Sequence, residues 1–295
     1  MDPARPFTLK ASLASRLLGA VEEAPWLERV NGAVTSALEP LLRRAESSLV
    51  LDLLHGRWLG HALHPVLSDL PIGFWTASLL LDWLGARWSA AILSAAGSAS
   101  AVATALSGVA DWTVTDGRER RLGLFHGLVN GAALTLQVGS LAARLTGDRR
   151  RARRISTVAW LAGVAAAYVG GELVFGRGLM VDHTAWLAGP DRWTPVLGSD
   201  DLAEGGTRKV EVEGRAVLLH RWRGAVHALE DTCSHAGGPL SEGEVEDGCV
   251  TCPWHGSRFS LSDGAVLGGP ATYPQLRLQA RVRKGRIEVR GRPGI

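Results

Sequence analysis

The chain has 295 residues, of which 46% are hydrophobic and 21% charged, with a formal net charge of +3 at pH 7. Its mean hydropathy of +0.08 averages strongly apolar and polar stretches, so the average conceals long apolar segments. The arginines that make the chain basic lie beside those segments and form no aromatic-studded groove, which argues against nucleic acid as a partner. The first residues lack the charged and apolar regions of a cleaved secretory signal.

Residues 1–60 mix polar and apolar stretches and form the first predicted region. The segments 12–30 and 36–54 repeat apolar residues at helical spacing, and we expect breaks near Pro25 and Pro40. This pattern predicts two amphipathic helices that lie on a membrane face or pack on the C-terminal module.

Residues 61–185 contain four apolar segments, each near the roughly 20 residues that a helix needs to cross a bilayer. The segments are residues 66–85, 88–110, 122–143 and 156–176. The second and fourth are rich in small residues, which let helices approach closely where lipid gives no hydrophobic drive. A soluble bundle is the alternative, but it would need alternating polar faces, and no charged residue lies between Trp88 and Ala110. We therefore predict an α-helical transmembrane four-helix bundle.

Polar residues occur inside these segments or at their ends, where a charge costs several kcal/mol unless it is paired or hydrated. They are Asp69, Asp82, Asp111, His126, Asn130 and Glu172. His61 and His64 share one helix face, and His126 lies near the start of the third segment. Two hypotheses follow: these three histidines bind haem, or the polar residues form helix caps and interhelical hydrogen bonds.

The last third of the chain contains two Cys/His pairs, Cys233-Ser-His235 and, sixteen residues later, Cys252-Pro-Trp-His255. Two thiolates and two imidazoles from two short loops suit a [2Fe-2S] pair, with Cys233 and Cys252 on one iron and His235 and His255 on the other. Zinc is the alternative, but zinc sites favour CxxC and HxxxH pairs. Cys249 is expected to be a buried strand residue and not a further ligand.

The text CSHAGGPLSEG and CPWHGSRFSLSDGAVLGGPATYP resembles the Rieske family over residues 193–292. The resemblance implies a [2Fe-2S] cluster and single-electron transfer. Rieske subunits of quinol-oxidising complexes carry a disulfide where this chain has Gly238 and Trp254. They also place a serine and a tyrosine near the cluster, where this chain has Ser257 and Phe259. The domain is therefore more similar to the ferredoxin and oxygenase branch.

The sequence from Leu54 to Gly85 is similar to the opening motif of a family of bacterial integral membrane proteins of uncharacterised function. The pair His126 and Asn130 and the pair Gly170-Gly171 fit the same family. This resemblance covers about residues 50–185 and implies no established activity.

Short β-branched runs separated by glycine turns predict strands within residues 193–292. They are residues 208–213, 216–220, 225–229 and 286–290. His220 and His227 are expected on the strand surface. The predicted fold is multi-domain: the helical membrane bundle followed by an all-β antiparallel sandwich with both ligand loops at one end.

The module is expected to move electrons without a complete active site of its own. The predicted function is a membrane-anchored carrier of single electrons to or from a partner protein, either a reductase or an acceptor enzyme. The alternatives are a redox- or iron-sulfur-responsive membrane sensor and a subunit of a quinol-oxidising complex. We expect an integral protein of the bacterial cytoplasmic membrane. Its arginine distribution gives conflicting orientations, and the lack of a bridging disulfide favours a cytoplasm-facing module.

Overall fold

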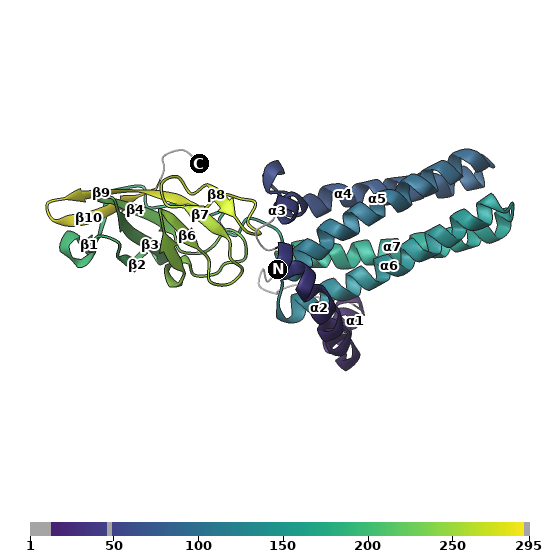
Figure 1. Ribbon diagram of the computed structural model, residues 1–295, viewed down its shortest axis with the longest axis horizontal. Coiled ribbons are helices and arrows are strands. Elements are labelled where there is room, and N and C mark those ends of the chain that lie inside the picture. Colours follow the sequence, from purple (N-terminus) through teal and green to yellow (C-terminus); the bar gives the residue numbers. More distant parts are fainter. Residues whose placement is uncertain (1–12, 46–48, 292–295) are drawn as a thin grey trace, which may run out of the picture. The chain divides into compact units, whose positions relative to one another are not determined.

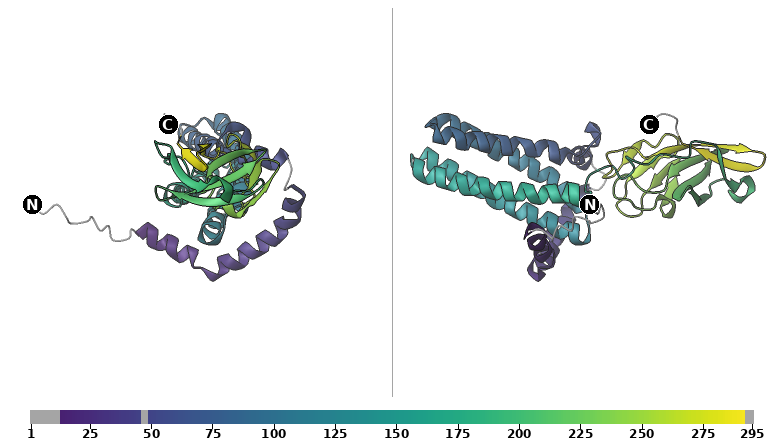
Figure 2. Two further views of the ribbon diagram at one scale, coloured as in Figure 1. Left: turned by 90° about the vertical axis from the view of Figure 1, so that its left-hand side faces the viewer. Right: turned by 180° about the vertical axis from the view of Figure 1, so that it is seen from behind.

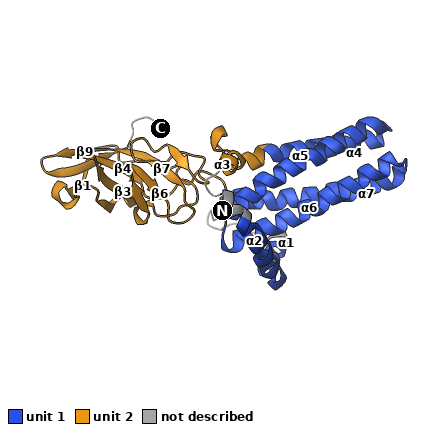
Figure 3. Ribbon diagram, in the orientation of Figure 1, with its two compact units in different colours: residues 1–46, 67–177 blue, residues 47–66, 178–295 orange. Residues whose placement is uncertain are grey.

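The structure is a computed structural model that describes residues 13–45 and 49–291. It divides into two compact units (Figure 3): residues 1–46 with 67–177, and residues 47–66 with 178–295. Positions 1–12 and 46–48 of the predicted region 1–60, and position 292 of the predicted region 193–292, lie outside the described residues.

The first unit is helical, and four of its helices run side by side (Figures 1 and 2). Helix α4 begins within the second unit and continues into the first. The helices are α1 (Leu13–Glu22), α2 (Pro25–Ala45), α4 (Leu63–Trp83), α5 (Arg87–Thr113), α6 (Gly117–Leu145) and α7 (Arg149–Gly171), which continues as the π-helical turn η2 (Glu172–Gly176).

All four predicted apolar segments are helical in the structure. Two helical stretches among the described residues, Arg87–Thr113 and Arg149–Gly176, are long and apolar enough to cross a membrane. Helices α4 and α6, which include Asp69 and Gln137 respectively, are not among these two stretches. The helical part of the prediction is confirmed, whereas four membrane crossings remain a prediction.

The prediction for the N-terminal region is partly wrong. Pro25 is the first residue of α2, where its missing N–H leaves no helical bond unmade. The predicted break at Pro40 is absent, because α2 continues through this residue. Leu27 of α2 is fully buried against Trp112 and Leu124, so α2 packs on α5 and α6.

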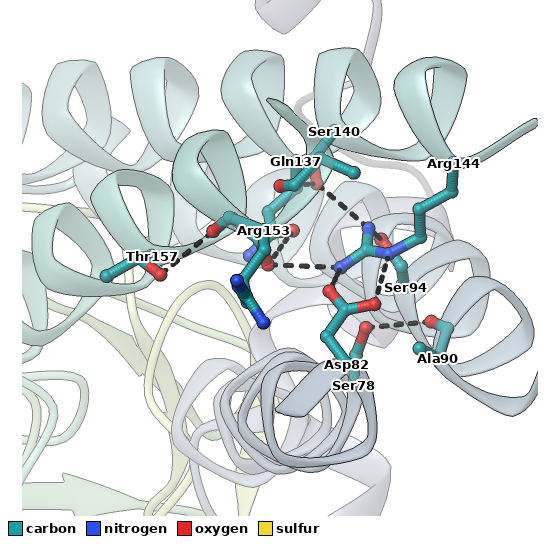
Figure 4. A network of polar contacts seen from close by, with 11 residues as sticks. Ser78, Asp82, Ala90, Ser94, Gln137, Ser140, Arg144, Arg153 and Thr157 are labelled. Carbon is teal, nitrogen blue, oxygen red and sulfur yellow. Dashed lines mark hydrogen bonds and ion pairs between the residues drawn. The ribbon is translucent and has the colours of Figure 1, made fainter. Parts of the chain in front are cut away.

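A buried arginine links the four long helices (Figure 4). The side chain of Arg144 in α6 is 2% exposed, and all five of its N–H donors have acceptors. Its Nε and Nη2 bind both carboxylate oxygens of Asp82 in α4, at 3.2 and 2.6 Å. Its remaining donors reach Ser94 of α5 and Ser140 of α6, at 3.1 and 2.9 Å, and Ser156 of α7, at 3.3 Å. A charge at this depth is therefore fully paired.

The second unit combines a short helical segment with antiparallel strands. The helical parts are α3 (Leu49–His55) and the 3-10 turns η1 (Arg57–Leu59), η3 (Ser199–Asp201) and η4 (Leu240–Glu242). One sheet has the order β1-β10-β9-β4-β3-β2, from Thr194–Gly198, Arg286–Arg290, Arg277–Arg283, Ala225–Glu230, Arg215–Trp222 and Thr207–Val212. The other has the order β5-β6-β7-β8, from Glu244–Glu246, Cys249–Thr251, Arg258–Ser260 and Val266–Gly268.

The four predicted strands correspond to β2, β3, β4 and β10, and the all-β character of this module is confirmed. The surface position predicted for His220 is wrong, because its side chain is buried and its Nδ1 lies 2.8 Å from the Thr207 hydroxyl. Thr207 lies directly opposite His220 in the β2–β3 register. This cross-strand hydrogen bond gives the buried His220 ring a polar partner. The alternation of residues along the strand did not reveal that the ring is buried.

The Arg144–Asp82 pair yields a test of what holds the helices together. Asp82→Asn leaves a buried guanidinium without its counter-charge, which should lower the free energy of unfolding by roughly 3–5 kcal/mol. Arg153→Met is the control, because Arg153 stacks 4.4 Å from the Trp83 ring centroid and its loss should cost about 1 kcal/mol. SDS titration of the full chain in detergent, followed by circular dichroism, measures both. Equal losses for the two variants would contradict this account of the helix contacts.

Candidate metal centre

Two loops with the same backbone hydrogen bonds carry the predicted ligands. In the first, the N–H of Cys233 donates to the carbonyl of Gly238, and the N–H of Gly237 donates to the carbonyl of Cys233, both at 2.9 Å. The second repeats the pattern from Cys252, with bonds to Ser257 at 2.8 Å and from Gly256 at 3.1 Å. Each turn therefore fixes a cysteine at its start and closes on itself five residues later.

Each turn also needs a glycine at the same place. Gly237 and Gly256 both lie four residues after the cysteine, with φ angles of 79° and 71°. This left-handed conformation is strained for residues with a Cβ atom. The two glycines therefore allow both turns to close in the same way.

The structure brings the four predicted ligands together. Cys233 and Cys252 are buried in the same core cluster, and their sulfur atoms share a hydrogen bond. The His235 and His255 rings lie next to each other, with centroids 5.2 Å apart and planes at 85°. Among the described residues, no group of three or more histidines, cysteines or carboxylates is arranged to hold a single metal ion.

The protonation of these residues suits metal binding. The hydrogen bond from Cys233 lowers the pKa of Cys252 to about 6, assisted by the backbone N–H groups of Trp254 and His255, whereas the same contact raises the pKa of Cys233. Burial lowers the pKa of His235 to about 3, and the neighbouring His255 adds to the effect. The His235 ring is therefore neutral at pH 7, the form in which imidazole binds a metal. The donor set fits a pair of irons held by thiolate and neutral nitrogen.

A glycine and a tryptophan occupy the space between the two loops. A Cβ atom added to Gly238 would lie 2.9 Å from the Cys252 sulfur and 3.0 Å from ring atoms of Trp254. The positions 238 and 254 therefore face each other across the loops. A bridging disulfide would need cysteines at these two places, and here the indole ring fills that space.

Gln275 supports the first ligand loop, and the sequence analysis did not find it. Its side chain is 2% exposed, and its Oε1 accepts the N–H of Ser234 at 2.9 Å. Its Nε2 donates to the carbonyls of Glu230 and Thr232, both at 2.7 Å. One side chain thus binds three backbone groups that lead into and through the loop. Gln275 lies outside the motif, and no residue pattern around it indicated this role.

Ser257 and Phe259 follow the second loop and are both fully buried. The Ser257 hydroxyl oxygen accepts the N–H of Ala271 at 3.2 Å, which leaves its own O–H to donate. Phe259 has no hydroxyl group and belongs to the apolar core beside Cys233 and Cys252. Phe259 thus supplies no hydroxyl donor to a metal centre here. Fewer donors lower the reduction potential of an iron-sulfur centre.

The remaining predicted metal residues lie elsewhere. Cys249 is a buried residue of β6, as expected. His61 precedes α4 and His64 lies in its first turn, within the second unit, whereas His126 belongs to α6 in the first unit. The Nδ1 of His126 lies 2.9 Å from the Ala166 carbonyl, and its Nε2 lies 3.1 Å from the Asn130 amide. The contact with Ala166 of α7 is an interhelical hydrogen bond of the kind one hypothesis expects, whereas the contact with Asn130 lies within α6. Haem binding by the three histidines remains a prediction.

Two protein families match the chain. The family described as Rieske [2Fe-2S] domain matches residues 192–283, and the family described as Predicted membrane protein (DUF2231) matches residues 60–186. Ferredoxin CarAc of Metapseudomonas resinovorans is 33% identical over 100 residues, which are 34% of this chain and 94% of that protein. The 3-phenylpropionate/cinnamic acid dioxygenase ferredoxin subunit of Photorhabdus laumondii is 38% identical over 95 residues, 32% of this chain and 90% of that protein.

Two further matches are a longer protein and a solved structure. Apoptosis-inducing factor 3 of Homo sapiens is 38% identical over 90 residues, 30% of this chain, and the chain spans 15% of its length. The ferredoxin of carbazole 1,9a-dioxygenase from Nocardioides aromaticivorans IC177 is 27% identical, with a TM-score of 0.33, covering 35% of this chain and all of that chain.

Through its C-terminal module, the chain belongs to the Rieske [2Fe-2S] family. It carries a [2Fe-2S] cluster, and its ferredoxin relatives support a role as an electron carrier that works with a partner oxidoreductase. Residues 60–186 match a family described only as a predicted membrane protein.

The role of Gln275 is testable by one substitution. Gln275→Leu leaves three backbone groups without a partner, and each buried loss costs about 1–3 kcal/mol. We expect the free energy of unfolding to fall by at least about 2 kcal/mol and the visible absorbance of the cluster to bleach faster on heating. Gln279→Leu is the control, because its amide oxygen accepts hydrogen bonds from the half-buried Arg290 side chain on the β9–β10 hairpin. Identical bleaching of both variants would show that Gln275 does not support the loop.

Proposed function

We propose that the chain is a membrane-anchored carrier of single electrons, with its cluster held by Cys233, His235, Cys252 and His255. The observation that carries the proposal is the convergence of two thiols and two imidazole rings on matched turns. A cluster of this type accepts and releases one electron at a time. Neutral nitrogen in place of two thiolates removes negative charge and raises its potential.

The four ligand residues differ in how deeply they are buried, and this difference indicates where electrons enter and leave. Cys233 and Cys252 are 1% and 3% exposed, so the sulfur side of the centre is sealed by the protein core. His255 is half-buried and is the least buried of the four ligand residues. We place electron exchange at this histidine, because the least covered ligand lets a partner approach the centre closely.

Membrane anchoring is supported by the side chains of the helical unit, where many large apolar side chains are exposed and many polar ones are buried. The most apolar windows of Arg87–Thr113 and Arg149–Gly176 are only 17% and 22% buried, unlike the core helices of a soluble protein. Large apolar side chains point outward, namely Leu80, Ile92, Leu106, Val138, Leu161 and Tyr168. Polar side chains are fully buried instead, namely Ser78, Ser94, Ser107, Gln137, Ser140 and Ser156. Lipid around the helices and polar contacts between them explain both sets.

The same distribution supports four crossings, because α4 and α6 share it with α5 and α7. We propose the bacterial cytoplasmic membrane as the location and its cytoplasmic side for the Rieske module. A redox partner, either a reductase or an acceptor enzyme, completes the reaction. A quinol-oxidising subunit is disfavoured by Gly238 and Trp254, which leave no bridging disulfide between the ligand loops.

A redox titration of the full chain tests the proposed carrier role. A ferredoxin-type carrier predicts a midpoint potential near the lower end of the Rieske range, about −150 mV, whereas quinol oxidation predicts one near the upper end, about +300 mV. His255→Cys replaces neutral nitrogen by a thiolate, so the cluster should persist at a lower potential with an altered electron paramagnetic resonance spectrum. Cys249→Ser is the matched control and should change neither. An unchanged spectrum for His255→Cys would refute the ligand assignment.

A further inference from the structure

Large apolar side chains are exposed around the ligand loops of the second unit. Trp58, Trp186 and Trp254 are 64%, 86% and 57% exposed. Together with Leu49, Leu53 and Leu267, which are also exposed, they form what we call the tryptophan collar. Soluble proteins seldom expose so many large apolar side chains in one region, and such regions mark interaction sites.

The collar belongs to the end of the module that carries the ligands. Trp254 lies in the second loop itself, between Cys252 and His255. Trp186 follows His183, whose N–H donates to the carbonyl of Ser234 in the first loop at 3.0 Å. This bond ties the segment with Trp186 to the residue between the first cysteine and the first histidine.

The segment of α3 and the following turn η1 contributes the collar residues Leu49, Leu53 and Trp58. The Nη1 of Arg57 lies 3.0 Å from the Asp52 carboxylate and donates to the carbonyl of Leu267 at 3.3 Å. A cavity of about 390 Å³ between α3 and the β8 region is lined by Leu53, Trp58 and Val266, among others. The chain just after Leu267 packs against the second loop, because a Cβ on Gly269 would lie 2.5 Å from the Gly256 carbonyl. The α3 segment therefore contacts the chain that packs against the loop carrying Trp254.

Chain connectivity indicates what the collar meets. Trp58 lies five residues before Leu63, where α4 begins, and Trp186 lies ten residues after Gly176, where the apolar stretch Arg149–Gly176 ends. Extended chain covers at most about 3.3–3.6 Å per residue, so these tryptophans stay within roughly 18 and 36 Å of the helix ends. Helices that cross a bilayer end at its surface. Tryptophan is also the side chain that prefers the boundary between lipid and water.

We propose that the tryptophan collar binds the surface of the lipid bilayer, so that the ligand loops of the Rieske module face the membrane. This inference rests on the proposed membrane anchor and adds to it the orientation of the electron-transfer end. Partners then reach the His255 edge along the membrane surface. A freely diffusing protein would find this edge obstructed by lipid.

Spin labels on the full chain in phospholipid nanodiscs test the proposal. Single cysteines are introduced as Trp186→Cys and, independently, Trp58→Cys, in a Cys249→Ser background, and Arg286→Cys serves as the control on the exposed β9–β10 hairpin. Collision with oxygen, which concentrates in lipid, is compared with collision with a water-soluble nickel chelate. The ratio of oxygen to chelate collisions should be several-fold higher at positions 58 and 186 than at position 286.

Each other outcome overturns the proposal in a recognisable way. Chelate collisions at positions 58 and 186 equal to those at 286, in chains that have entered the nanodisc, would show that the collar faces water. Exclusion of both reagents would show that protein covers the collar. Failure of the chain to enter nanodiscs while its cluster spectrum is intact would instead overturn the membrane anchor on which the proposal rests.

Discussion

The candidate centre depends on one backbone constraint, the closure of two matching turns that each begin at a cysteine. Each turn bonds the cysteine N–H to a carbonyl five residues later and places a left-handed glycine four residues after the cysteine. With both turns closed in this way, Cys233 and Cys252 lie in the same core cluster, and the His235 and His255 rings lie next to each other. The chemistry of the site therefore follows from backbone geometry before any metal binds.

The helical unit solves a different problem, which is to pack helices whose apolar faces point outward. Buried serines and a fully paired arginine lie between the four long helices there, alongside small apolar residues such as Ala90 and Ala159. In the Rieske module the arrangement is reversed, with Leu218, Leu229 and Phe259 inside. The two units thus fit two different solvents, which is the physical basis for proposing a membrane anchor joined to a water-facing electron carrier.

Much of this was predictable from local sequence. The Cys/His spacing gave the ligand set because ligands on one short loop must be close in sequence as well as in space. Four strands with short apolar, β-branched runs were also predictable, whereas arginine-rich β9 was not predicted, although its polar and apolar residues alternate. Gln275 could not be predicted, because its partners lie about 40 residues away. The packing of α3 on the β8 region is a long-range contact of the same kind.

Two sequence-based predictions were wrong. His220 was expected at the surface because alternation does not reveal a cross-strand partner such as Thr207. Pro40 was expected to end a helix, yet α2 continues through it.

The most direct test of the central claim is the nitrogen hyperfine spectrum of the reduced, anaerobically purified full chain, measured by pulsed electron paramagnetic resonance alongside iron and sulfide analysis. The account predicts two nitrogen ligands coupled to the cluster, with two irons and two acid-labile sulfides per chain. A preparation that contains zinc without sulfide, or a cluster spectrum without nitrogen coupling, would contradict it.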